Sequence, residues 1–368
     1  MISFQKRVCI NKELNMQEIN WKCCPLVAQN PITRAFIEQM AKERKSQSTI
    51  ENYSRDLNDF LSAFPDLPFS ELIEADESRI ADYVDWLWKR ESKHQDRSKI
   101  TYTSGSKLAP ATIRRRLSAL RCFYRWSIRL RHRQDSLNPV REGIRGRERG
   151  LVAVPTSVPW IPDERQWQAI LKHVLTTCSL RDQVIVLLAH DGALRREEIV
   201  RLRVDDIDWQ THTIAIRAEI TKNKLPGTIV LSHPTWLRLK EYLEGDRTAL
   251  ITCYGGDWNG PILLSDSQRN PGQPITKWTV KDLFDRLRAD LHLPQLTPHK
   301  MRHLMLTELK KSGMELLDVS RYGRHRRLAS TEVYLHTDLS DLAHQINQAH
   351  RHLETLVAQV EAEHHEEE

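Results

Sequence analysis

A charged segment that ends in prolines divides this chain into two blocks of different character. It runs from Asn138-Pro139 to Pro155 and Pro159, and it separates a run of helical patterns from a longer block that mixes helical and β-rich patterns. At 368 residues the chain has room for two domains whose cores need no disulfides. We expect a mainly α protein with a small β-hairpin or sheet (α+β), divided into an N-terminal extension (1–29), a four-helix domain (30–145), a linker (146–156), a mixed helical domain (157–350) and a C-terminal helix end with an acidic tail (351–368).

The composition excludes several classes of protein. The six cysteines form no C-x-x-C pair, so neither a disulfide framework nor a cysteine zinc site is expected. The longest strongly apolar run, near residues 184–189, is too short to span a membrane, and the charged N-terminus predicts no signal peptide. Motifs for ATP-binding P-loops, zinc proteases and serine hydrolases are absent from the sequence. We therefore expect a cytoplasmic protein with no metal and no cofactor.

Positive charge is unevenly distributed along the chain. The net charge is only +6, but residues 30–150 carry +7 and residues 151–368 carry −3. Within the first block, residues 107–149 hold 13 Lys and Arg against three acidic residues. Such a density indicates contact with a polyanion, most often a nucleic acid. For a single basic helix, a solvated surface is an equally good explanation.

The centre of this basic stretch is a predicted helix, residues 111–133, with Pro110 in its first turn. Its apolar residues recur at helical spacing and make one stripe: Ile113, Leu117, Leu120, Tyr124 and Ile128. A basic row runs beside the stripe, and a helix of this kind suits a DNA groove. We therefore expect DNA contacts from the following residues: Arg114, Arg115, Ser118, Arg121 and Arg125.

The remaining elements follow from periodicity and capping signals. The N-terminal domain has predicted helices at 31–45 and 76–90, a third opened by the capping box Ser48-x-x-Glu51, and a polar loop at 93–106. In the second block, β-rich segments at 213–220 and 227–231 predict a hairpin, and a short strand is expected at 261–264. Further helices are expected at 179–190, 193–202, 235–243, 279–291, 298–312, 316–322, 331–336 and 339–360.

Arginines and histidines recur near the predicted helix starts of the second block. Arg195 lies in Leu194-Arg195-Arg196-Glu197-Glu198, His299 and Arg302 lie three residues apart, and His325 precedes Tyr334 by nine residues. Taken singly, each has an ordinary structural explanation, such as a salt bridge, a helix-surface pair or a core tyrosine. Their order and spacing carry the information.

Together these motifs resemble the tyrosine recombinase, or phage-integrase, family over about residues 30–350. Leu194-Arg195 with Glu198 resembles the family's first box, His299 and Arg302-His303 the second, His325 the third, and Val333-Tyr334-Leu335-His336 the nucleophile segment. The family usually has Leu-Gly before the third-box histidine, whereas Gly323-Arg324 precedes His325 here. Either the local turn differs, or Arg324 adds a phosphate contact. The extension 1–29 is also too short for the separate arm-binding domain of some integrases.

The resemblance implies a site-specific DNA recombinase that works through a 3′-phosphotyrosyl intermediate and a Holliday junction. Tyr334 would be the nucleophile, and Arg195 and Arg302 would hold the phosphate. His299 would act as a general base, and His325 would donate to the phosphate.

Two further roles stay open at this point. In the family a lysine on the hairpin protonates the leaving oxygen; Lys222 is the preferred candidate and Lys224 the alternative, because the register of the hairpin tip is uncertain. Glu198 either orients a group of the site or forms a structural salt bridge.

The resemblance also implies partners. These are a double-stranded DNA recombination site, a homodimer on each site, a homotetramer in the synapse and, as an open question, an accessory directionality factor. Helix 339–360 packs either on its own domain or on a neighbouring copy. Other readings are a type IB topoisomerase-like relaxase and a non-catalytic DNA-binding regulator. Whether the enzyme serves a phage, a genomic island, a transposon or dimer resolution is not readable from the sequence.

Overall fold

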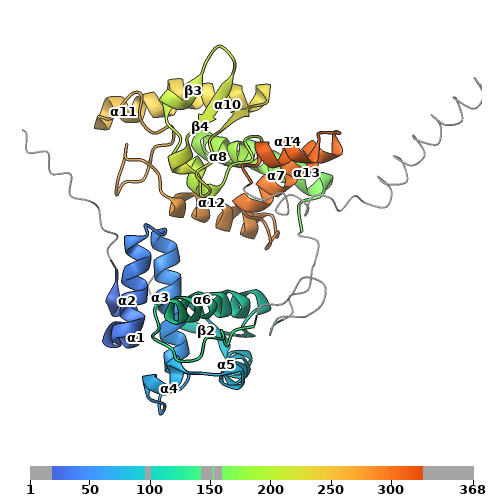
Figure 1. Ribbon diagram of the computed structural model, residues 1–368. Helices are drawn as coiled ribbons and strands as arrows, with labels where there is room; N and C mark the ends of the chain where they lie inside the picture. The colour runs from blue at the N-terminus through green and yellow to red at the C-terminus, as the bar shows by residue number, and fades with distance from the viewer. Residues whose placement is uncertain (1–18, 96–100, 142–151, 153–159, 326–368) are drawn as a thin grey trace, which may run out of the picture. The chain divides into compact units, whose positions relative to one another are not determined.

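The computed structural model describes residues 19–95, 101–141, 152 and 160–325. The chain divides into two compact units, Met1–Thr156 and Ser157–Glu368, which are described separately (Figure 1). None of the helices within these described ranges has the length and apolar character that a membrane crossing requires.

The N-terminal unit is mostly helical. After a 3-10 turn, η1 (Trp21–Cys23), its helices are α1 (Pro25–Gln29), α2 (Pro31–Lys42), α3 (Gln47–Ser62), α4 (Phe69–Ile73), α5 (Glu77–Lys89) and α6 (Pro110–Arg129). The predicted capping box at Ser48 is wrong. The N-cap of α3 is Ser46, whose hydroxyl accepts from the Thr49 amide and also bonds the Thr49 hydroxyl.

Part of the predicted N-terminal extension belongs to the core of this unit. Cys24 and Val27 are fully buried in the same cluster as Phe36 and Ile37. The Thr33 hydroxyl donates to the Val27 carbonyl at 3.0 Å and fixes α1 against α2. Residues 19–29 therefore belong to the N-terminal unit rather than to a separate extension, and residues 1–18 lie outside the described part of the chain.

The predicted loop at 93–106 is also wrong. Its residues form most of an antiparallel pair, β1 (Glu91–Gln95) and β2 (Thr101–Lys107), in which Glu91 pairs with Lys107 and Gln95 with Thr101. The segment is mostly polar, with Ile100 and Tyr102 as its large apolar residues, and lacks the sustained alternation of apolar and polar residues that marks a half-buried strand. Backbone pairing, which leaves no such signal in the sequence, forms this hairpin.

Helix α6 buries its predicted apolar stripe and ends four residues earlier than predicted. Residue Arg131 has a φ of +58°, which breaks the helix after Arg129. Arg133 then turns inward, where only 5 % of it is exposed, and donates to the carbonyls of Ile73 at 2.7 Å and Ala75 at 2.8 Å. These two bonds satisfy carbonyl groups at the end of α4 and just after it.

Acidic residues of α3 tie it to the basic helix α6. Asp56 is buried and accepts from Nη2 of Arg115 at 2.9 Å, and Asp59 accepts from Arg90 and Arg116. Three of the many positive charges in this region are thus held by carboxylates of the same unit.

The second unit is built around a buried helix, α8 (Leu180–His190). All residues from Arg181 to His190 are buried, and α7, α9, α10 and α13 pack against this helix (Figure 1). The other helices are α7 (Glu164–Thr177), α9 (Arg196–Ile199), α10 (His233–Tyr242), α11 (Thr248–Tyr254), α12 (Lys277–Asp290), α13 (Pro298–Lys311) and α14 (Leu316–Tyr322), with turns η2 (Val204–Asp206), η3 (Ala218–Ile220) and the π-helical η4 (Leu243–Arg247).

A small antiparallel sheet covers part of this helical core. Its strands are β3 (Ile207–Asp208), β4 (Thr213–Ile216) and β5 (Gly227–Val230), in the order β3-β4-β5. Ile214 of β4 and Ile229 of β5 pair and are both buried. The predicted hairpin is confirmed, although its first strand is shorter because η3 occupies residues 218–220.

Three predicted elements of this unit are wrong. The helix expected at 193–202 is reduced to α9, because Ala193 has a φ of +44° and Arg195 is extended. Segment 261–264 makes only isolated β-bridges. The helix expected to end at 243 continues through η4 and α11 to Tyr254. The helices predicted at 331–336 and 339–360 lie outside the described residues.

Candidate active site

Arg195 and Glu198 are joined at the start of α9. Arg195 is the N-cap residue, and three residues later Glu198 accepts from its backbone amide at 2.9 Å and from its Nη1 at 2.8 Å. Glu198 is completely buried, whereas 21 % of the Arg195 side chain is exposed. The salt bridge therefore holds the guanidinium of Arg195 in one orientation at the surface of the unit, which unites the two roles considered for Glu198.

Arg302 connects two backbone segments of the site. It projects from α13, whose N-cap Thr297 accepts from the Lys300 amide, and it is completely buried. Its two terminal nitrogens donate to the carbonyls of Ala193 and Gly323. Because Ala193 lies two residues before Arg195 and Gly323 two residues before His325, Arg302 brings the first and third motifs together.

Arg324 occupies the turn between α14 and His325 and faces the interior. Its φ is +51°, and only 1 % of its side chain is exposed. Its Nη2 donates to Glu198 at 2.9 Å and to the Ala193 carbonyl at 3.0 Å. Its Nη1 donates to the Tyr322 carbonyl at 2.8 Å, so both terminal nitrogens of Arg324 bond groups of the protein. A phosphate contact from Arg324 stays a prediction that these bonds do not support.

Three histidines of the site are neutral at pH 7. Nε2 of His303 lies 3.0 Å from Nε2 of His299 and forms a hydrogen bond with it. Burial by neighbouring atoms, and then the charges of Arg302 and Arg195, lower the pKa of both His299 and His325 to about 4. Burial, followed by the neighbouring His299, lowers the pKa of His303 to about 3. The His299 side chain is exposed, which weakens the contribution of burial to its low pKa. The nearby charges of Arg302 and Arg195 remain as causes of the shift.

The hairpin tip brings Lys222 to the same place. Lys222 is exposed, and its positive charge is the smallest of the causes that lower the pKa of His299. Nδ2 of Asn223 donates to the carbonyl of Arg324 at 3.1 Å and anchors the tip. Lys224 instead has a φ of +56° and donates to the Glu219 carbonyl at 3.4 Å. These contacts favour Lys222 over Lys224 as the proton donor.

The sequence prediction missed three contributors to this site. The sequence places His303 in the second box without a role, gives no signal for Asn223, and does not predict the interior position of Arg324. The signal for Arg324 was its departure from the family pattern. Tyr334 lies outside the described residues, so its position relative to these groups is not part of the structure.

The predicted DNA-contacting residues of α6 have different surroundings. Arg114 and Arg125 are exposed, Arg115 is paired with Asp56, and the Ser118 hydroxyl donates to the Arg114 carbonyl. Their contact with DNA remains a prediction.

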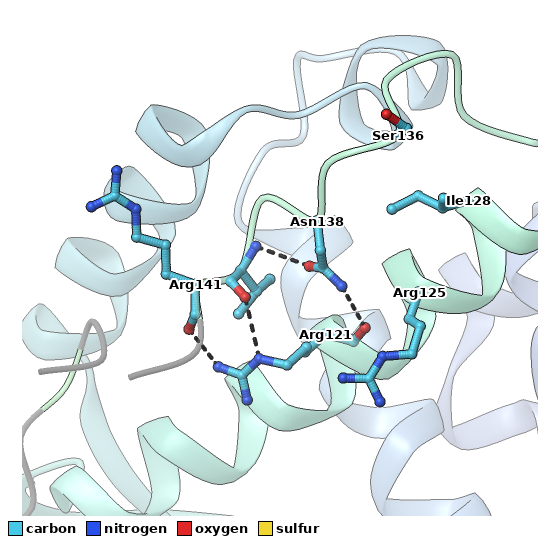
Figure 2. A pocket seen from close by; sticks show the side chains of 7 residues that line it. Arg121, Arg125, Ile128, Ser136, Asn138 and Arg141 are labelled. Carbon is cyan, nitrogen blue, oxygen red and sulfur yellow. Dashed lines mark hydrogen bonds between the residues drawn. The ribbon is translucent and has the colours of Figure 1, made fainter. Parts of the chain in front are cut away.

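Arg121 has a structural task beside the predicted one. Its guanidinium donates to the carbonyls of Val140 at 3.2 Å and Arg141 at 2.7 Å, and Asn138 donates to the Arg121 carbonyl at 3.0 Å (Figure 2). These bonds tie the segment after α6 back onto the helix. A cleft of about 380 Å³ opens there, lined in part by Arg121, Arg125 and Arg141.

Oriented arginines and neutral histidines around one turn define a site for phosphoryl transfer, and the basic helical unit defines a polyanion as its substrate. Comparison with known proteins agrees. The phage integrase family model matches residues 162–340, and the model of the N-terminal SAM-like domain of phage integrases matches residues 34–130. The chain belongs to the phage integrase family of tyrosine recombinases.

Individual relatives share the sequence distantly and the fold clearly. Tyrosine recombinase XerC of Staphylococcus aureus (strain MSSA476) is 23 % identical over 321 residues, which cover 85 % of this chain and 94 % of XerC. The Tn1549 transposon integrase in complex with circular intermediate DNA has a TM-score of 0.60 at 16 % identity, covering 88 % of this chain and 98 % of that one. The XerH site-specific recombinase bound to palindromic difH substrate has a TM-score of 0.62 at 16 % identity, covering 89 % and 87 %.

The low pKa values of the histidines make stability depend on pH. In the unfolded chain these histidines have a pKa of about 6.5, whereas His299 and His325 have a pKa of about 4 in the folded protein. Between these pH values the unfolded chain binds more protons than the folded protein, so lowering the pH favours unfolding. We expect the unfolding temperature of the DNA-free protein to fall as the pH is lowered from about 6.5 to 5, measured by circular dichroism.

Two observations would attribute the fall in unfolding temperature to these three histidines. Burial alone would lower the pKa of His190, but hydrogen bonds with Asp191 and Glu308 raise it to about 9, so its contribution changes at higher pH. His303→Gln removes one of the three depressed groups and should make the fall smaller. An unfolding temperature that is flat over this window would contradict the predicted pKa shifts.

Proposed function

We propose that Tyr334 is the nucleophile of a site-specific recombinase whose phosphate site is built by Arg195, Arg302, His299 and His325. The observation that supports this most is the convergence of Arg195 and Arg302 on the turn Gly323–His325, which carries His325. Arg302 bonds the Gly323 carbonyl, and Nη2 of Arg195 lies 3.5 Å from the Arg324 carbonyl.

The proposed reaction exchanges one phosphoester bond for another at each step, so the energy of the broken DNA phosphodiester is kept in the bond to Tyr334. The phenolic oxygen of Tyr334 attacks the phosphorus, the bond to the 5′ oxygen breaks, and a 3′-phosphotyrosyl ester forms. A 5′ hydroxyl from a second strand then attacks this ester and releases the tyrosine. Exchange of one pair of strands in this way yields a Holliday junction, and neither ATP nor a metal is required.

Arginines stabilise the charge that develops on the phosphate. Both are fixed before DNA arrives, Arg195 by Glu198 and Arg302 by two carbonyls, so their donors need no reorganisation in the transition state. Loss of one such donor typically costs about 3 kcal/mol of transition-state stabilisation.

Protons move between the histidines, the lysine and the two oxygens. The negative charge of the arriving phosphate favours protonation of His299 and offsets the cations that depress its pKa. His299 can then accept the Tyr334 proton, while neutral His325 donates a hydrogen bond to a non-bridging oxygen. Lys222 gives its proton to the departing 5′ oxygen.

The partners follow from this chemistry. We propose a double-stranded recombination site as substrate, a homodimer on each site and a homotetramer in the synapse, in the bacterial cytoplasm with the nucleoid. Both structural neighbours, the Tn1549 transposon integrase and the XerH recombinase, are in complex with DNA. Whether a directionality factor takes part, and which mobile element or replicon is served, stays open.

Covalent adduct formation tests the nucleophile. On a nicked, strand-trapping duplex taken from the DNA that flanks the gene, the wild type should form an adduct that survives SDS, also in EDTA. Tyr334→Phe should bind the same duplex and form no adduct, because the ring lacks the attacking oxygen. An adduct in Tyr334→Phe would disprove the assignment, and DNA binding without any wild-type adduct would favour a non-catalytic regulator.

Recombination separates the remaining alternative. The wild type should join strands from two site-bearing duplexes, whereas a relaxase would only unwind supercoiled DNA of any sequence.

A sulfur leaving group tests Lys222 as the acid. Lys222→Ala should form adduct at least about 100-fold more slowly than the wild type on normal DNA, because the 5′ oxygen then departs without a proton. A substrate with sulfur in place of that bridging oxygen should restore the rate, since a thiolate leaves without protonation. Lys224→Ala is the matched control and should cleave normal DNA at nearly the wild-type rate. If Lys224→Ala is the variant that cleaves normal DNA slowly and is restored by the sulfur substrate, Lys224 is the acid instead of Lys222.

Salt dependence tests the basic helix. DNA affinity should fall steeply with salt, and Arg114→Ala or Arg125→Ala should each reduce the slope of log K against log salt by about 1. Arg79→Ala, which removes a half-buried arginine of α5 paired with Asp82, should leave the slope unchanged. Equal slopes for all four proteins would show that this face of α6 is only solvated.

A further inference from the structure

Arg324 lies where every described segment of the phosphate site meets. Its side chain donates to Glu198 and to the Ala193 carbonyl, and its own carbonyl accepts from Arg195 and Asn223. It therefore contacts the start of α9, the segment before it and the hairpin tip that carries Lys222. Its neighbour Gly323 provides the carbonyl that holds Arg302.

The hairpin also packs on the aliphatic stem of Arg324. A Cβ placed on Gly227, the first residue of β5, would lie 3.1 Å from both Cγ and Cδ of Arg324. The absence of a side chain at Gly227 thus lets the strand approach the stem closely. The Arg324 side chain therefore contacts both β5 and Glu198 of α9.

The backbone of Arg324 is unfavourable for a residue with a side chain. Its φ of +51° lies in the left-handed region, which glycine adopts without strain and residues with a Cβ atom adopt only with strain. Such a conformation persists where surrounding contacts over-determine it, and here the guanidinium bonds supply them. Glycine would fit the backbone of this turn better. The contacts of the arginine side chain therefore offset the backbone strain at this position.

The charge balance explains why the side chain matters. Burial alone would raise the pKa of Glu198, but Arg324 and then Arg195 hold it below its usual value and keep it ionised. Without Arg324 the buried carboxylate would keep Arg195 as its one cationic partner among the described residues, and the Ala193 carbonyl would keep Arg302.

We infer that Arg324 is a positioning residue for strand cleavage, which acts by sharing the buried carboxylate of Glu198 with Arg195 and the Ala193 carbonyl with Arg302. In this proposal Arg324 acts through its neighbours, by setting the orientation of Arg195 and Arg302, which the proposed function assigns to the phosphate. This inference rests on the proposed recombinase function.

Single-turnover cleavage of the nicked duplex, together with DNA affinity, tests the inference. Arg324→Gly keeps the left-handed turn and removes the guanidinium, and we expect adduct formation at saturating DNA to slow at least about 10-fold, with a dissociation constant within about two-fold of the wild type. Arg324→Lys keeps the charge but offers one nitrogen where the guanidinium uses two, Nη2 for Glu198 and the Ala193 carbonyl and Nη1 for the Tyr322 carbonyl, so its rate should be intermediate. Arg321→Ala is the matched control, because Arg321 is 71 % exposed in the same segment and pairs only with Asp318 in the described structure.

A double-mutant comparison distinguishes positioning from general loss of structure. Glu198→Gln and Arg324→Gly disturb the same arrangement, so the double variant should be about as slow as the slower single variant rather than slower by the product of both effects. Unfolding temperatures are measured in parallel. If Arg324→Gly does not fold, the comparison uses Arg324→Lys.

Three outcomes would overturn the inference: a wild-type cleavage rate in a folded Arg324 variant, a loss confined to DNA affinity, or effects that multiply with Glu198→Gln. A wild type that forms no adduct would instead overturn the proposed function.

Discussion

A completely buried carboxylate organises the second unit. Burying an ionised group is costly unless it is paired and hydrogen-bonded, and Glu198 meets this condition with the guanidinium and amide of Arg195 and the guanidinium of Arg324. Those partners come from opposite ends of the unit's described sequence. The ion cluster therefore specifies the relation between α9 and the turn before His325, and the phosphate site depends on that relation.

The turn after α8 explains how the hairpin joins this cluster. A Cβ on Gly192 would lie 2.7 Å from Cδ1 of Ile229 and 3.0 Å from the Leu188 carbonyl, so the turn and β5 are in close contact. The next residue, Ala193, is left-handed and directs its carbonyl at Arg302 and Arg324. A rigid, buried α8 thus positions a backbone acceptor for two arginines, and the same contact places the hairpin with Lys222.

Positive charge is arranged differently in the two units. In the N-terminal unit, carboxylates of α3 hold part of the arginines of α6, and others remain at the surface. In the second unit, the arginines are interior or fixed, and the histidines beside them stay neutral because a further positive charge there is unfavourable. A site in this state is complementary to one phosphate, whose negative charge relieves the repulsion.

The sequence by itself determined much of this protein. Pattern predicted α8, α12, α13 and α14 closely, and the first three begin at a capping residue, Ser179, Thr276 and Thr297. Motif order indicated the family and the residues Arg195, His299, Arg302 and His325. The sequence failed where no apolar pattern exists, as in the polar hairpin β1–β2, and where a single left-handed residue ends a helix, as at Arg131 and Ala193.

Only the tertiary structure decided what the arginines do. Arg121, Arg324 and Arg302 look alike in the sequence, yet one ties down a loop, one shares a buried carboxylate and one bridges two carbonyls. The physical reason is that a guanidinium takes its role from the acceptors around it, and those acceptors are backbone carbonyls and carboxylates brought close by the fold from distant parts of the chain.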